Sequence, residues 1–173
     1  MDKKPGPARI DDDSSRSGLQ RRPSLRRVMA AGVFDLLHLG HVHYLTEAKK
    51  FGDELVVVVA TDVMVAKRKH QPIVPQEQRL ALVAALKPVD AAILGSPHDQ
   101  YATVAAVQPD VIALGYDDYH AADDLRAELA ERGFGHVEVA RCPKFDVHDL
   151  NGTRKIVRRI LEMYDREGME GAP

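Results

Sequence analysis

The sequence has one cysteine, no tryptophan, and only five tyrosines and four phenylalanines among its 173 residues. A single cysteine, Cys142, excludes an internal disulfide and a cysteine-based zinc cluster. It fits the reducing cytoplasm, where we expect the protein to reside. Unbroken apolar runs such as Leu55–Ala60 are far too short to span a bilayer. The polar first thirty residues do not resemble a secretory signal, so the composition indicates a globular protein with no membrane segment.

Positive charge is concentrated at the beginning of the chain. Residues 1–27 carry eight Lys or Arg and four Asp, whereas the whole chain has a net charge of −2, so the remainder is net negative. A net-negative body argues against a nucleic-acid substrate. Residues 1–24 have scattered Pro, Gly and Ser without a regular period, which predicts a disordered basic N-terminal arm, either a solvated leader or an electrostatic tether. We expect one domain over residues 25–166 and a flexible tail over 167–173.

Short apolar runs alternate with helical patterns from residue 25 onward. The runs are typical of strands buried on both faces, and they cover 27–31, 54–61, 90–94, 110–114 and 136–140. The helical patterns cover 40–51, 75–86, 100–107, 121–132 and 153–164, the last with Ile156, Ile160 and Met163 on its inner face. This alternation predicts a Rossmann-like α/β domain with a parallel five-stranded sheet flanked by helices. Ligands of such sheets bind beyond the carboxyl ends of the strands.

The segment that follows the first strand reads GVFDLLHLGH and covers residues 32–41. Gly32 permits a turn, and a helix is predicted to begin near Gly40 with its free N–H groups at the carboxyl edge of the sheet. Such N–H groups, together with those of Val33 and Phe34, form an anion site. Gly40 would let a phosphate approach the backbone closely. The segment therefore indicates a phosphate-binding turn.

Two histidines flank this predicted helix start. His38 and His41 are three residues apart, which places both rings on one side of a helix. Imidazoles can donate hydrogen bonds to the charge that builds up during phosphoryl or nucleotidyl transfer. The segment has no serine or cysteine nucleophile, so we infer direct transfer without a covalent intermediate. A metal-binding or surface pair is the alternative, and we interpret His43 as a helix-surface residue.

Basic residues after the second strand are further candidates. Lys67, Arg68 and Lys69 lie in a predicted loop and are either a mobile lid over the β,γ-phosphates or a solvated charge run. Arg79 lies in the first turns of a predicted helix, where a guanidinium can bind a phosphate through two hydrogen bonds. A salt bridge on the helix surface is the equal alternative for Arg79.

Two later segments also lie at predicted carboxyl ends. Asp117 and Asp118 follow the fourth strand, where one carboxylate could bind a ribose or a base and the other could cap the next helix. Thr153 and Arg154 begin the last helix, which is either a second phosphate-binding N-terminus or an ordinarily capped helix with surface charges.

Residues 32–41 also resemble the signature of the cytidylyltransferase-like nucleotidyltransferases. The likeness extends over about residues 27–160. It includes AKKFGD at 48–53, residues 67–90, LGS at 94–96 and PDVIALGYDD at 109–118. Within the family, the chain looks most similar to the archaeal FAD synthases and next to the glycerol-3-phosphate cytidylyltransferases.

The resemblance implies transfer of AMP from ATP to FMN, giving FAD and pyrophosphate. It implies that Lys49 contacts the nucleotide phosphates and that Asp117 contacts the nucleoside. Together with the residues argued above, the expected catalytic and nucleotide-binding set is Gly32, Val33, Phe34, His38, Leu39, Gly40, His41, Lys49, Arg79, Asp117, Thr153 and Arg154.

Three departures from the family pattern are present in this sequence. Val33 replaces the usual threonine, and Leu150–Lys155 stands where the glycerol-phosphate enzymes have Gly-Ile-Ser-Thr-Thr. Of the two cysteines found in some archaeal FAD synthases, only Cys142 is present. An alcohol-phosphate cytidylyltransferase that uses CTP remains the first alternative, and a regulator that binds nucleotide without turnover is the second.

A flavin acceptor would need an apolar slot for its flat ring. The aromatic residues near predicted carboxyl-edge segments are Phe34, Tyr116, Tyr119 and Phe145, and aliphatic loop residues could serve as well. The triphosphate needs Mg²⁺, which binds mainly through substrate phosphates, so we expect no protein metal ligands. Asp35 is a candidate only for a structural hydrogen bond, and a homodimer is left open.

Overall fold

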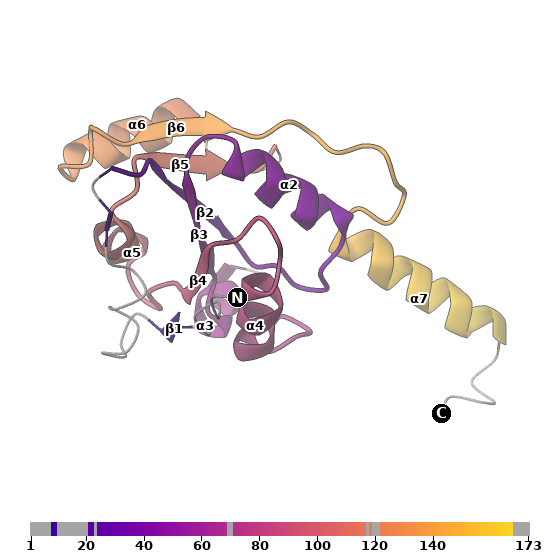
Figure 1. Ribbon diagram of the computed structural model, residues 1–173. Helices are drawn as coiled ribbons and strands as arrows, with labels where there is room; N and C mark the ends of the chain where they lie inside the picture. The colour runs from indigo at the N-terminus through magenta and orange to yellow at the C-terminus, as the bar shows by residue number, and fades with distance from the viewer. Residues whose placement is uncertain are drawn as a thin grey trace.

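The computed structural model describes residues 8–9, 21–22, 24–68, 71–116, 118 and 122–167, and a parallel sheet forms its centre (Figure 1). Its main strands are β2 (Arg27–Gly32), β3 (Glu54–Val59), β4 (Ala91–Leu94), β5 (Val111–Leu114) and β6 (Glu138–Arg141). Their order across the sheet is β4-β3-β2-β5-β6, and every neighbouring pair is parallel. The predicted five-stranded parallel sheet is therefore confirmed. The two-residue strand β1 (Ala8–Arg9) pairs with the outer edge of β4.

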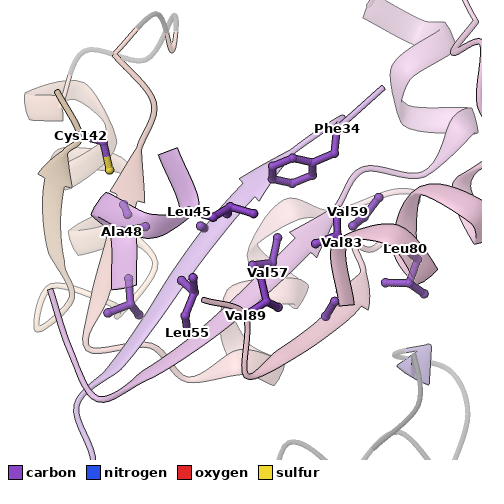
Figure 2. Close-up of a cluster of buried hydrophobic side chains, with 14 of the residues drawn as sticks. Phe34, Leu45, Ala48, Leu55, Val57, Val59, Leu80, Val83, Val89 and Cys142 are labelled. Carbon is purple, nitrogen blue, oxygen red and sulfur yellow. The ribbon is translucent and has the colours of Figure 1, made fainter. Parts of the chain in front are cut away.

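Helices cover both faces of the sheet. They are α2 (Leu39–Lys49), α3 (Asp62–Arg68), α4 (Gln76–Ala84), α5 (Gln100–Val107), α6 (Ala122–Glu131) and α7 (Thr153–Glu167). Side chains of α2 and α4 pack with one face of the sheet, as Figure 2 shows for Leu45, Val57 and Val83. Side chains of α5 and α6 pack with the other face. Successive strand residues point to opposite faces, so the uninterrupted valines of β3 fill both core layers.

The strand order reverses beside β2. The chain runs from β2 outward through β3 to β4, and then crosses to β5 and β6 on the other side of β2. The carboxyl ends of β2 and β5 therefore lie at the switch point where open α/β sheets bind their ligands. The turn between β2 and α2 begins at this place, which is where the sequence predicts the phosphate-binding segment.

The last helix differs from the expectation. Ile156, Ile160 and Met163 were predicted to face inward, but Ile160 is 44% exposed and Met163 is 49% exposed. Figure 1 shows α7 extending away from the sheet at the end of a long connection from β6. The prediction of an inner face was wrong because an amphipathic pattern shows that a helix has an apolar face, and not what covers that face.

The remaining differences concern the connections and the chain ends. Lys67 and Arg68 belong to α3 rather than to the predicted loop, and Lys69 lies outside the described residues. Most of the predicted arm and residues 168–173 of the predicted tail also lie outside them, so both segments stay predictions. Of the helices in the described parts of the chain, none has the length and apolar character needed to cross a membrane.

Candidate active site

The turn between β2 and α2 folds back on itself over a buried phenylalanine. Phe34 and Leu36 have φ angles of 56° and 47°, in the left-handed region that non-glycine residues rarely adopt. The Phe34 ring is 2% exposed and packs over Gly32, where a Cβ atom would lie 2.9 Å from the ring. Its contact with His41 is edge-on, with ring centroids 5.3 Å apart. Phe34 therefore supports the His41 ring from the core, and its side chain is not available to line a flavin slot.

The two predicted catalytic histidines lie together at the start of α2. His38 is the N-cap residue with extended backbone angles, and its ring stacks on His41 with centroids 3.8 Å apart and planes 20° apart. The prediction that both rings share one side of the helix start is confirmed. Since α2 begins at the switch point, the pair lies where its helix N-terminus can also bind an anion.

His41 is held in its neutral form. Burial, followed by the neighbouring His38, lowers the pKa of His41 from 6.5 to about 3, although the Asp35 carboxylate opposes this shift. The Nδ1 atom of His41 is buried and makes no hydrogen bond within the described part of the chain. At neutral pH the ring is therefore an uncharged imidazole, which can donate one hydrogen bond and accept another.

Gly40 has a packing role in addition to the predicted one. A Cβ atom at this position would lie 2.5 Å from the main-chain oxygen of Asn151 and 3.0 Å from the His38 ring. The segment preceding α7 therefore approaches Gly40 closely, and the approach of a phosphate to its main-chain N–H group stays a prediction. Two distant parts of the chain meet here, and any side chain would separate them or displace His38.

Asp35 and Thr153 connect the turn to its neighbours. The Asp35 carboxylate accepts hydrogen bonds from the main-chain N–H groups of Ile73 and Val74, both at 2.9 Å. The Thr153 hydroxyl donates to the main-chain oxygen of Asp35 at 2.7 Å. Asp35 therefore has the structural role that was expected of it. Thr153, predicted to bind nucleotide, anchors the first turn of α7 to the site instead, and Arg154 beside it is exposed.

Arg79 is a buried tie between loops and not a surface residue. Its Nε donates to the Val74 oxygen at 2.8 Å, and its Nη1 donates to the Val33 oxygen. Its Nη2 donates to the Ala60 oxygen at 2.9 Å and to the Asp62 carboxylate at 2.6 Å. The side chain is fully buried. Both predicted roles, phosphate binding and a surface salt bridge, are wrong for this structure, because the guanidinium is occupied in joining three carboxyl-edge connections.

Lys49 lies at the opposite edge of the sheet. Helix α2 starts at the carboxyl edge and rises about 1.5 Å per residue, so its eleven residues carry Lys49 roughly 16 Å back toward the amino ends of the strands. There its Nζ donates to the Asp53 oxygen and the Asp90 carboxylate, both at 2.5 Å. The expected phosphate contact by Lys49 is therefore wrong.

A third histidine, His43, is partly buried, which the sequence analysis does not predict. The Nε2 atom of His43 is buried and makes no hydrogen bond among the described residues. Its ring stacks on Phe145 with centroids 4.8 Å apart, and Phe145 in turn packs against His148. The interpretation of His43 as a helix-surface residue was wrong, because the segment after β6 folds over α2, and no signal in the sequence indicates that contact.

The structure gives fewer contacts for the other candidate residues. Lys67 lies 3.5 Å from the Pro97 oxygen at the carboxyl edge. Tyr116 is 48% exposed at the end of β5, whereas Asp117 and Tyr119 lie outside the described residues. No group of three or more His, Cys, Asp or Glu side chains among the described residues could hold a metal ion.

Comparison with known proteins identifies the family of this chain. The cytidylyltransferase-like family model matches residues 29–168. The FAD synthase of Aciduliprofundum boonei is 51% identical over 139 residues, which cover 80% of this chain and 93% of the relative. The FAD synthase of Methanoregula boonei is 50% identical over 137 residues, which cover 79% and 91% of the two chains.

Solved structures agree on the fold. The crystal structure of a lipopolysaccharide core biosynthesis protein from Thermoplasma volcanium has a TM-score of 0.68 and 49% identity, and the match covers 70% of this chain and 99% of that one. Pantoate-beta-alanine ligase from Francisella tularensis has a TM-score of 0.60 at 14% identity, over 96% and 82% of the two chains, which supports the fold alone. With the paired histidines at the switch point and a family match that spans most of its length, the chain belongs to the cytidylyltransferase-like family of nucleotidyl-transferring enzymes.

Proposed function

We propose that this enzyme transfers AMP from ATP to FMN and releases FAD and pyrophosphate. The observation that carries the proposal is the stacked pair of His38 and His41 at the N-terminus of α2, beside the switch point of the sheet. Identities of 50% and 51% to FAD synthases support the choice of substrates.

The reaction is a direct displacement at phosphorus. An oxygen of the FMN phosphate forms a bond to the α-phosphorus of ATP, and the bond from that phosphorus to the oxygen bridging it to the β-phosphate breaks. Pyrophosphate leaves with the electron pair. The attacking phosphate is already an anion, so no base has to remove a proton, and the protein contributes mainly positioning and electrostatic stabilisation.

The two imidazoles stabilise the charge on the reacting phosphates. His41 is neutral and packed between Phe34 and His38, so it donates its hydrogen bond from a fixed position. The N–H groups at the start of α2 add a partial positive charge. The main-chain N–H groups of Val33 and Phe34 and the exposed guanidinium of Arg154 are the further phosphate donors that we propose.

We also propose Mg²⁺ as the divalent cation that accompanies the triphosphate. Mg²⁺ that accompanies a triphosphate is held mainly by the substrate's phosphates and by water. When bound, the ion neutralises part of the charge on the triphosphate. The chain's own task is then to align the nucleotide with FMN.

Two further proposals concern the cellular location and the oligomeric state of the enzyme. We place it in the cytoplasm, which fits its lone and buried cysteine. We also propose that it works as a homodimer. Neither proposal bears on the chemistry at the histidines.

The experiment that tests the function is a substrate panel. Purified protein is incubated with Mg²⁺, ATP or CTP, and FMN or glycerol 3-phosphate, and the products are identified by mass. We expect FAD and pyrophosphate from ATP and FMN, with falling flavin fluorescence because the adenine stacks on the flavin ring. CDP-glycerol without FAD would favour the cytidylyltransferase alternative. Nucleotide binding without pyrophosphate release would favour the regulator.

A matched pair of variants links activity to the site. His41→Ala removes a proposed donor, whereas His136→Ala removes an exposed histidine that precedes β6 at the amino edge of the sheet. We expect FAD formation to fall sharply only in the first variant. Equal activity in both variants would contradict the assignment of the site.

A further inference from the structure

The pairing of β2 with β5 ends before the carboxyl end of β2. The last matched residues of this pair are Ala30 and Ala113, whereas β2 stays paired with β3 as far as Gly32. The next residue of β2, Ala31, is exposed, although the four residues before it are buried. The ends of β2 and β5 are therefore accessible between the two strands, directly beside the turn that leads to the histidines.

The other side of the same turn is closed by hydrogen bonds. The buried Arg79 guanidinium binds main-chain oxygens of three connections there, and the Asp35 carboxylate binds two main-chain N–H groups. In the proposed function the triphosphate lies at the N-terminus of α2, so the accessible side leads its nucleoside over the end of β5. This placement of the nucleoside rests on the proposed function.

The chain leaves β5 through a tight turn that begins at Gly115. The main-chain N–H group of Asp118 donates to the Gly115 oxygen at 3.2 Å, which is the hydrogen bond of a β-turn. Tyr116 within this turn is 48% exposed. The turn therefore lies at the accessible end of β5, and the position of its main chain decides what can lie over that end.

Arg141, the last residue of β6, binds the main chain of this turn. Its Nη1 atom lies 2.7 Å from the oxygen of Gly115 and 3.3 Å from the oxygens of Tyr116 and Asp118. Arg141 is paired in register with Leu114, the last residue of β5, and β6 lies beside β5 in Figure 1. Three oxygens with partial negative charge thus meet at one positively charged nitrogen, which offsets their repulsion.

We propose that Arg141 is a positioning residue that holds the turn after β5 where it receives the nucleoside of the bound nucleotide. It acts through the main chain of the turn, so its effect is confined to the nucleoside end of the substrate. Its three contacts lie at the surface, where water replaces lost hydrogen bonds at little cost in stability. Loss of the side chain therefore displaces the turn without unfolding the sheet.

The first test compares binding of ATP with binding of tripolyphosphate, which has the same phosphate chain but no nucleoside. Isothermal titration calorimetry with Mg²⁺ measures both affinities for the wild type and for Arg141→Met. We expect the variant to bind ATP about tenfold more weakly, as for loss of one charge-assisted hydrogen bond, and to bind tripolyphosphate like the wild type. Equal weakening for both ligands, or unchanged binding of both, would overturn the proposal.

Arg126→Met is the matched control for this variant. Arg126 of α6 also binds β6, and its Nη2 atom donates to the Val139 oxygen at 2.8 Å, which is two residues closer to the amino edge than Arg141. Both variants should lower the melting temperature slightly and by similar amounts, whereas ATP binding should weaken only in Arg141→Met. Equal weakening of ATP binding in the two variants would contradict the assignment, and so would an Arg141→Met chain that does not fold.

Arg141→Lys tests the role of the charge. A single nitrogen makes the three contacts, so the ammonium group of a lysine, which has three donors, can replace it in part. We expect this variant to recover most of the affinity for ATP that Arg141→Met loses. No recovery would contradict the role of a cation at these three oxygens.

Steady-state kinetics separate this proposal from the proposed function. The products of the wild type decide the function, whereas the ratio of each variant to the wild type decides the role of Arg141. Arg141→Met should raise the KM for ATP about tenfold and leave kcat and the KM for FMN nearly unchanged, as for loss of uniform binding of one substrate. If the wild type uses CTP and makes no FAD, the same comparison is made with CTP. Equal rises in both KM values, or a wild type that binds neither nucleotide, would overturn the role of Arg141.

Discussion

His41 combines a position in the site with an environment that removes its charge. Phe34 contacts its ring in a T-shaped arrangement, His38 stacks on its face, and burial lowers its pKa to about 3. Most histidines titrate near pH 6.5 and change their charge within the physiological range. Here the imidazole stays neutral throughout that range. In the protein without bound nucleotide, the charge of His41 should therefore not vary between pH 6 and pH 8.

The His41→Ala variant tests whether this donor acts in the transition state. We expect kcat to fall by about 10²–10³-fold while the affinity for ATP changes far less, as for removal of one positioned donor. Steady-state kinetics and nucleotide titration separate the two effects. A kcat within a few-fold of the wild type would show that His41 does not stabilise the reacting phosphates.

The low pKa of His41 also predicts how stability depends on pH. The unfolded chain binds a proton on this histidine below about pH 6.5, whereas the folded chain does so only near pH 3. Between these values the unfolded state holds more protons, so stability falls on acidification by up to about 1.4 kcal/mol per pH unit. Urea unfolding at pH 4.5 and pH 7 should show a smaller pH dependence for His41→Gln. An unchanged dependence would mean that other groups cause it.

Arg79 shows the limit of sequence reasoning at this scale. The sequence places a guanidinium in the first turns of a helix at the carboxyl edge, and that location is correct. Its function depends on Val33, Ala60 and Val74, whose oxygens surround it only after three connections have folded together. Local spacing contains no information on those distances. The same reason explains the missed stacking of His43 on Phe145.

At the scale of elements, helix α2 separates two groups that the sequence places near each other. His38 and His41 belong to its beginning, and Lys49 to its end. The apolar runs and periodicities predicted all five main strands and the positions of five helices within a few residues. The position of Lys49 at the amino edge of the sheet follows from the length of α2 alone, so it could have been predicted from the sequence. The outcome for α7 could not, because nothing in its sequence shows whether the domain covers its apolar side.

The Lys49→Met variant tests this separation. We expect an unchanged kcat and an unchanged KM for ATP, because Lys49 binds Asp53 and Asp90 at the amino edge. Loss of a partly exposed ion pair should cost about 0.2–1 kcal/mol of stability. Kinetics and thermal unfolding measure the two quantities. A large rise in the KM for ATP would restore the phosphate contact implied by the family resemblance.

At the scale of the whole molecule, the two edges of the sheet have different tasks. The carboxyl edge holds the histidines, while ion pairs gather at the amino edge. These pairs are Arg21–Asp110, Arg26–Glu138, Arg27–Glu54 and Lys49–Asp90. Arg21, which belongs to the predicted basic arm and possible tether, thus binds an acidic residue of the fold, as do the neighbouring Arg26 and Arg27. The charge available to such a tether is correspondingly smaller.

Truncation of the N-terminus tests how much the ion pair of Arg21 at the amino edge contributes to stability. Removing residues 1–20 should leave turnover and the melting temperature nearly unchanged. Removing residues 1–24 should cost up to about 1 kcal/mol more, because it also removes the pair between Arg21 and Asp110. Differential scanning calorimetry compares the two truncated chains. A large loss on the first truncation would show that the arm, including β1, stabilises the sheet.

The hydrogen bond from Thr153 to Asp35 joins residues that are 118 positions apart. During synthesis on the ribosome, the strands and the histidine pair can form before Thr153 has emerged. A nascent chain, or one cut before α7, would then contain a folded sheet with an unfinished site. Turnover would begin only after release of the complete polypeptide, so truncated products of interrupted translation should fold without making product.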